Sequence, residues 1–67
     1  MNQLNHQTIL SKVNPIQIEL YNLIKENEID GVTMATADAT TIHQLFNNQR
    51  RVIMQYEQLK RTIMIEV

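Results

Sequence analysis

The feature that most constrains this chain is a row of residues in its C-terminal half that recur at alternating steps of three and four. This spacing places side chains on one side of an α-helix and is typical of the seam of a coiled coil or helical bundle. The row consists of Ile42, Leu45, Gln49, Val52, Tyr56, Leu59 and Ile63. Phe46, Ile53 and Val67 widen it into a face. Such a face needs a sizeable covering surface, which we expect another protein chain to supply.

The length and the absence of cysteine support this expectation. The chain has 67 residues, no cysteine and two histidines, His6 and His43. A single core of this size rarely supplies more than about 3–5 kcal/mol of net stability without a staple. Disulfides and thiolate zinc sites are excluded, and two histidines cannot by themselves close a structural zinc site. Oligomerisation is the remaining staple, and no metal or cofactor is expected.

The termini and hydropathy predict a cytoplasmic protein. The first seven residues lack the basic and apolar regions of a secretory signal. No segment approaches the roughly 20 apolar residues of a membrane span. The absence of cysteine also fits a reducing compartment. We therefore expect neither a membrane nor a small-molecule substrate as a partner.

Charge is divided unevenly along the chain, although the formal net charge is only −1. Acidic residues dominate residues 1–38, and basic residues dominate residues 39–67. Arg50, Arg51 and Arg61 are the candidate contacts for a nucleic acid. Glu57 lies within one helical turn of Arg61 and partly pairs its charge. A phosphate-binding surface needs several unpaired cations on one face, so nucleic acid is the alternative partner rather than the favoured one.

Helix-start signals coincide before a first predicted helix over about 15–30. Asn14 can cap it, Pro15 suits its first position, and Gln17 completes a capping box. Gly31 is expected to end it in the left-handed conformation. Its main apolar face is formed by Ile16, Leu20, Leu23 and Ile24. Residues 1–13 form either a separate short helix or a flexible arm, because Pro15 favours a break.

The remainder of the chain is predicted to be one loop and one long helix. Residues 31–37 have no strong period and form the connection, and Thr36 or Asp38 caps a helix over about 38–65. The expected fold class is all-α: one small domain, residues 1–67, arranged as a helical hairpin that completes a bundle with another chain.

Few residues of the sequence suggest a specific role in binding or catalysis. Gln49 is the only polar residue of the seam, where a buried amide can specify register, or it can lie at the rim and reach water. Tyr21 lies off the main face of its helix and is a candidate anchor for a partner. His43 with Asp38, or His6 alone, could move a proton, but no serine, cysteine or carboxylate cluster accompanies them. We do not expect an enzyme.

The sequence thus predicts a non-enzymatic protein-interaction module, a regulator, inhibitor or adaptor that self-associates or docks an amphipathic helix on a partner protein. The predicted interface comprises Ile42, Leu45, Phe46, Gln49, Val52, Ile53, Tyr56, Leu59, Ile63 and Tyr21. In length and layout the chain resembles small helical-hairpin regulators of bacteria and phages, and the small cochaperones of type III secretion needles. The alternative is a dimeric four-helix-bundle RNA-binding regulator that uses Arg50, Arg51 and Arg61.

Overall fold

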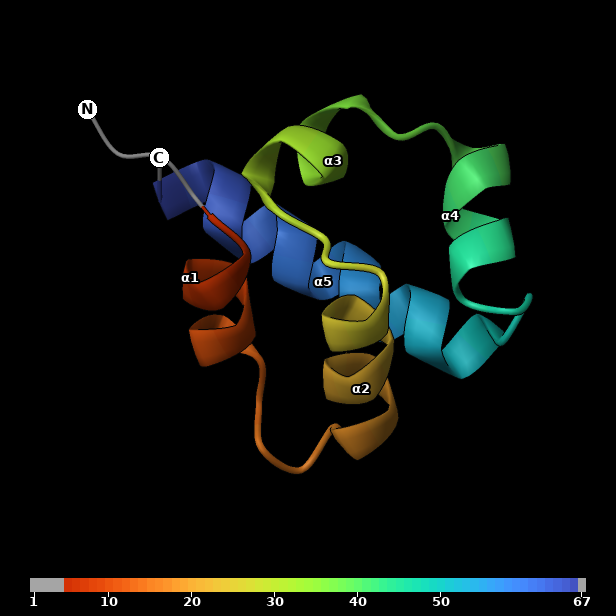
Figure 1. Ribbon diagram of the computed structural model, residues 1–67, viewed down its shortest axis with the longest axis horizontal. Helices are drawn as coiled ribbons and strands as arrows, with labels where there is room; N and C mark the ends of the chain where they lie inside the picture. Colours follow the sequence, from red (N-terminus) through yellow and green to blue (C-terminus); the bar gives the residue numbers. More distant parts are fainter. Residues whose placement is uncertain (1–4, 67) are drawn as a thin grey trace.

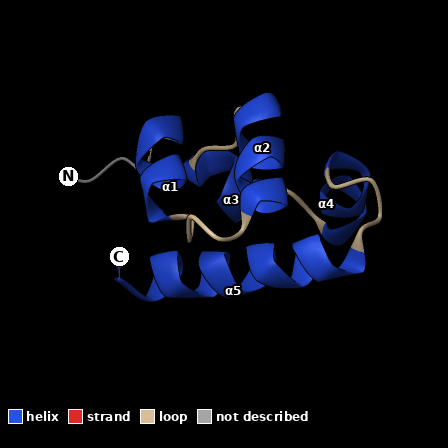
Figure 2. Ribbon diagram, turned by 90° about the horizontal axis from the view of Figure 1, so that it is seen from below, coloured by secondary structure: helices blue, strands red, loops and turns tan. Residues whose placement is uncertain are grey.

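The computed structural model describes residues 5–66, which form five α-helices and no strand. The helices are α1 (His6–Lys12), α2 (Ile18–Glu26), α3 (Gly31–Thr36), α4 (Ala39–Leu45) and α5 (Arg50–Glu66). The all-α prediction is confirmed. In Figure 2, α5 forms a base that α1 and α2 cross side by side, while α4 lies at the end where α5 begins. Five helices replace the two long helices and the possible short helix that the sequence indicated.

The break at Pro15 is confirmed, but the helix that follows begins later than predicted. Helix α1 is capped by Asn5, whose Oδ1 accepts the backbone N–H of Thr8 at 2.8 Å. Asn14 does not cap a helix, because its Oδ1 and carbonyl accept the N–H groups of Ile16 and Gln17 in a local turn. Helix α2 therefore begins at Ile18. Ile16 lies in the turn and is 84% exposed instead of belonging to the apolar face.

Helix α2 ends at Glu26 rather than near residue 30, and Gly31 does not end it. The N–H groups of Glu28 and Ile29 donate to the carbonyls of Lys25 and Ile24, which is the Schellman pattern. Glu28, with φ 49°, takes the left-handed position predicted for Gly31. The turn carries Ile29 into the core, where it is fully buried.

The predicted loop over 31–37 contains a short helix. Asp30 accepts the N–H of Thr33 at 2.8 Å and caps α3, so Gly31 is the first residue of a helix and not the end of one. Met34, in the middle of α3, is fully buried. Its burial stabilises a helix that has too little periodic sequence to be recognised from its pattern.

The long helix predicted over 38–65 is interrupted. Of the two predicted caps, Thr36 and Asp38, it is Asp38 that caps its first part, because its carboxylate accepts the N–H of Thr41 at 2.8 Å. After Leu45 the chain turns through Asn47 and Asn48, with φ 55° and 57°. Their N–H groups donate to the carbonyls of Gln44 and His43, so α4 ends in a second Schellman turn. Asparagine tolerates this backbone better than most residues, which makes the interruption possible.

Among the described residues, twelve buried side chains form one core to which all five helices contribute. Phe46 and Tyr56 meet edge to face with ring centroids 4.8 Å apart and an interplanar angle of 68°. The core consists of Ile9, Val13, Leu20, Ile24, Ile29, Met34, Ile42, Phe46, Val52, Ile53, Tyr56 and Ile63. Figure 1 shows how α1, α2 and α3 gather over α5. The apolar face of the C-terminal half is thus covered largely by the chain itself.

Candidate interaction surfaces

The structure places most of the predicted interface inside the molecule. Ile42, Phe46, Val52, Ile53, Tyr56 and Ile63 are buried. Leu45 and Leu59 are partly buried beside them. The folded chain therefore does not present this face to a partner. The prediction assumed that a second chain would cover the face, but helices of the same chain cover it.

The other residues of that prediction lie outside the core. Gln49 is exposed, because the turn before α5 takes it out of the helical row. Tyr21 lies on α2 and is 38% exposed. Val67, which the sequence placed on the same apolar face but not in the predicted interface, lies outside the described residues.

A groove runs between α5 and the segment that connects α1 to α2. Figure 2 draws this segment on the side of α5 that faces α1 and α2, and residues of both elements line the same hollows. Two adjoining hollows of about 180 and 200 Å³ make up the groove, and both are lined by Gln17 and Gln55. One also contains Lys12, Asn14, Gln58, Leu59 and Thr62, and the other Ile16, Ile18, Glu19, Arg51 and Val52. This groove was not predicted, because it depends on the turn at residues 14–17.

The groove combines amide side chains with exposed apolar ones. Ile16 is 84% exposed and Ile18 is 65% exposed. Neither side chain contributes to the core, so packing within the chain does not explain them. Gln17, Gln55 and Gln58 each carry donor and acceptor groups in one side chain. The surface therefore offers both apolar contact and hydrogen bonds to a ligand.

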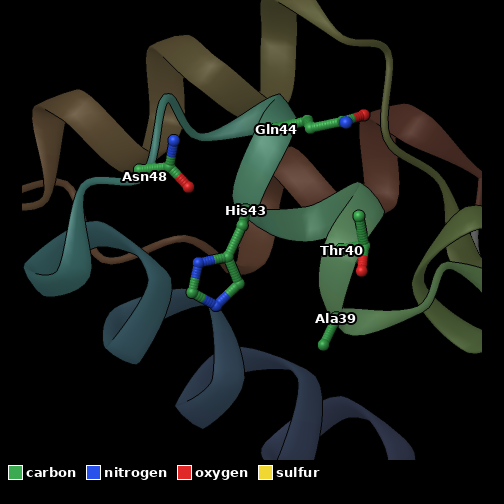
Figure 3. Close-up of a pocket in the computed structure, with 5 residues that line it drawn as sticks. All are labelled: Ala39, Thr40, His43, Gln44 and Asn48. Atoms are coloured by element: carbon green, nitrogen blue, oxygen red, sulfur yellow. The ribbon is translucent and has the colours of Figure 1, made fainter.

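Helix α4 forms a second surface of different chemistry. Ile42 is its only buried residue. A hollow over the helix is lined by Ala39, Thr40, His43, Gln44 and Asn48. In Figure 3, His43 and Asn48 lie along one edge of this exposed face, and Thr40 and Gln44 lie along the other. Apart from Ala39, the face consists of one hydroxyl group, two side-chain amides and one imidazole.

The three arginines proposed as nucleic-acid contacts do not form one cluster. Arg50 begins α5 and follows Asn48 by two residues, so it adjoins the α4 surface. Arg51 lines the groove. Arg61 lies about three helical turns further along α5. Only Arg50, with Arg51 beside it in sequence, belongs to the neighbourhood of α4.

Several titratable groups of the described residues take part in hydrogen bonds or packing that support the fold. His6 Nδ1 hydrogen-bonds to the carbonyl oxygen of Ile29 at 3.0 Å, which ties α1 to the turn after α2. Backbone N–H groups of Thr33 and Thr41 lower the pKa values of Asp30 and Asp38 respectively. Burial raises the pKa of Tyr56 to about 12, with a smaller contribution from Glu57. Within residues 5–66, no group of three or more His, Cys, Asp and Glu side chains could hold a metal ion.

Comparison with known protein families, with characterised proteins and with solved structures finds no match to this chain. Among the helices of residues 5–66, none combines the length and apolar character that a membrane crossing requires.

Proposed function

We propose that this protein is a non-enzymatic binding protein, and that the groove between α5 and residues 12–19 receives an extended segment of a partner protein. The exposure of Ile16 and Ile18 at the groove supports this proposal most directly. Two β-branched apolar side chains held in water beside a polar hollow have no role in the fold. Desolvating them on binding is favourable, at roughly 25 cal/mol per Å² of apolar surface.

The dimensions and chemistry of the groove suit an extended peptide. Its α5 side runs from Arg51 to Thr62, which corresponds to about 16 Å at 1.5 Å per residue. A segment of about five extended residues spans that length. Amides along the groove can pair with the N–H and carbonyl groups of such a segment, while Ile16 and Ile18 contact its apolar side chains. A regulator, an adaptor and a secretion cochaperone would each use this surface, and the partner distinguishes them.

The mode of binding differs from the one inferred from the sequence. There, the amphipathic helix itself was expected to dock on the partner. The folded chain buries that helix face, so the partner is expected to come to the groove and not to replace the core.

Site-specific photo-crosslinking tests the proposal in the full chain. A photoreactive amino acid is placed at position 16, and for comparison at Val32, which is also apolar and 70% exposed but lies on α3. We expect a discrete protein adduct from position 16 and none from position 32. Peptide mapping of the adduct should place the crosslink in an extended or unstructured segment of the partner.

Charge substitutions then connect the adduct to the groove. Ile16→Glu with Ile18→Glu should abolish partner binding without changing the circular dichroism spectrum, because both side chains are exposed. Val32→Glu is the matched control and should leave binding intact. Equal loss in both variants, or adducts from both positions, would contradict the assignment to the groove. An adduct with a second copy of the chain would also count against a separate partner.

A further inference from the structure

The turn between α4 and α5 has a sequence that is compatible with a continuous helix. Residues 46–49 are Phe, Asn, Asn and Gln, and they include neither the proline nor the glycine that most disfavours a helix. Helices α1, α3 and α4 each begin after a capping side chain, namely Asn5, Asp30 and Asp38. Gln49, which precedes α5, is not a residue type that commonly caps helices. The interruption therefore has no helix-start signal of its own.

The backbone of this turn is sterically unfavourable. Asn47 and Asn48 have φ values of 55° and 57°, and both lie in the left-handed region. Asparagine visits this region more readily than most non-glycine residues, but usually as a single residue. Two such residues in succession favour an alternative in which both become helical. A short connection under strain also promotes domain swapping, in which two copies of a chain exchange one element.

The row of three-four spacing continues across the turn. In the folded chain Gln49 is exposed and lies outside this row. In a continuous helix over residues 39–66, Gln49 returns to the side that carries Ile42, Leu45 and Val52, because steps of three and four keep side chains on one face. The straight helix therefore keeps its apolar residues on one side, where they can pack on a core.

A straight helix cannot keep the core contacts of α5 within one chain. Phe46 and Tyr56 lie on either side of the turn, and their ring centroids are 4.8 Å apart. In a continuous helix these two positions are separated by about 15 Å at 1.5 Å per residue. Figure 2 shows α5 extending from the turn beneath α2 and α1, so straightening the turn also carries α5 away from these helices. Tyr56 and the other buried side chains of α5 must then be covered by another chain.

We propose that residues 46–49 are a hinge, and that this chain has a second state, a domain-swapped dimer in which α4 and α5 form one helix. The partner is a second copy, because it presents the same core surface that α5 fits within one chain. Each α5 packs on helices α1 to α4 of the other copy. Helix α4 stays with its own chain, where Asn27 Nδ2 donates to the carbonyl oxygen of Leu45 at 3.3 Å.

The closed monomer predominates in dilute solution, because opening removes α5 from the core until a second chain replaces it. The dimer is favoured at high protein concentration. The peptide groove is present in both states, since residues 12–19 of one copy and α5 of the other form it again in the dimer. The second state is therefore independent of the proposed function, and Ile16→Glu with Ile18→Glu should leave the dimer fraction unchanged.

Paired substitutions at the hinge test the proposal in the full chain. Asn47→Ala with Asn48→Ala disfavours the left-handed backbone and favours a helix. Asn47→Gly with Asn48→Gly is the matched control, because glycine accepts the left-handed backbone and disfavours a helix. The two variants and the wild type are refolded from urea over a wide range of concentration. Light scattering after size exclusion then measures the fraction of dimer.

We expect the alanine variant to form the most dimer, the wild type less and the glycine variant least. Each alanine should favour the helical hinge by about fivefold. A dimer contains two copies of both substitutions, so its dissociation constant should fall by about several hundredfold relative to the wild type. The dimer should also have a stronger helical circular dichroism signal per residue than the monomer, because residues 46–49 join the helix.

Crosslinking distinguishes a swapped dimer from any other dimer. Gln17 and Gln55 line the same two hollows but belong to opposite sides of the hinge in the sequence. The chain has no cysteine, so Gln17→Cys with Gln55→Cys introduces one pair of sites for a bifunctional thiol reagent. These changes are added to the alanine variant and to the wild type. The isolated dimer should give links between chains that persist in denaturant, and the monomer should give links within one chain.

Several results would overturn the proposal. One is an alanine variant that unfolds or remains monomeric at every concentration, because the swapped state would then be too unstable to replace the closed one. Equal dimerisation of the glycine variant would show that the hinge conformation is irrelevant. Links only within single chains in the isolated dimer would indicate a dimer that does not exchange α5. A wild type without any dimer at the highest concentration would confine the second state to the variant.

Discussion

At the scale of single residues, the most unusual group is the hydroxyl of Tyr56. The side chain is fully buried against Phe46, and its Oη has no hydrogen-bond partner among the described residues. A buried hydroxyl without a partner costs about 1–3 kcal/mol relative to its hydrated state. The aromatic ring therefore stabilises the core while the hydroxyl opposes it.

Replacing Tyr56 with Phe should leave the free energy of unfolding at neutral pH unchanged or raise it by about 1 kcal/mol, because the orphaned hydroxyl is removed and the ring is kept. Urea denaturation of the two proteins measures this difference. A loss of more than about 1 kcal/mol would mean that the hydroxyl has a partner after all.

The raised pKa of Tyr56, about 12 against an ordinary value of 10, predicts sensitivity to alkali. Between these pH values the unfolded chain releases the phenolic proton and the folded chain retains it. The unfolded state is therefore favoured progressively as the pH rises from 10 toward 12, and below pH 10 the effect is absent. Tyr56→Phe should lose less stability over this interval than the wild type. Parallel loss in both proteins would contradict the assignment.

At the scale of helices, short polar segments decide where each element begins and ends. Asp30 and Asp38 cap α3 and α4, and Asn47 and Asn48 separate α4 from α5. Asp38 was one of two predicted caps, with Thr36, because both precede a helical pattern. The Asn47–Asn48 turn was missed, although asparagine is a recognised turn former, because the three-four row continues past them through the polar Gln49 to Val52. The three-four period was interpreted as one helix over about 38–65, although it extends over two helices, α4 and α5.

The left-handed conformation at Asn47 can be tested by two substitutions of similar size. Asn47→Gly should be tolerated, because glycine adopts this conformation without steric cost. Asn47→Ala should destabilise the protein by about 1 kcal/mol, because its Cβ opposes a positive φ. Thermal melting of both variants checks the order. Equal stability would mean that the turn at residue 47 rearranges.

Acid should weaken the caps. Backbone N–H groups stabilise the ionised carboxylates of Asp30 and Asp38 and lower their pKa values. Their stabilising contribution is present above the ordinary aspartate pKa and is lost as the pH falls through the lowered value. Asp38→Asn keeps a capping side chain but cannot be protonated in this range. Its melting temperature should therefore fall less than that of the wild type between about pH 5 and pH 2. Identical acid profiles would show that this cap does not depend on charge.

At the scale of the whole molecule, the chain closes its own core. The residues expected to meet a second chain meet α1, α2 and α3 instead, and two surfaces of different chemistry remain: the groove with Ile16 and Ile18, and the polar face of α4. The sequence could not locate either surface, because each depends on a turn that redirects the backbone.

A self-contained core predicts folding that does not depend on protein concentration. The helical circular dichroism signal and the melting temperature should stay constant on wide dilution, since no second chain is needed to cover the apolar face. Light scattering after size exclusion identifies the species present. A melting temperature that rises with concentration would show that association supplies part of the stability.

The all-α class, the break at Pro15 and the cap at Asp38 follow from local interactions, and all three were readable in the amino-acid pattern. Apolar spacing also identified Ile42, Val52, Tyr56 and Ile63 as buried. It could not show what buries them, because periodicity reports which side of a helix avoids water and not which surface covers it. That was decided by the turns at Glu28 and at Asn47 and Asn48. The steric cost of the left-handed backbone at these turns is offset by the burial of Ile29 and Phe46. Such tertiary contacts are not contained in any local sequence pattern.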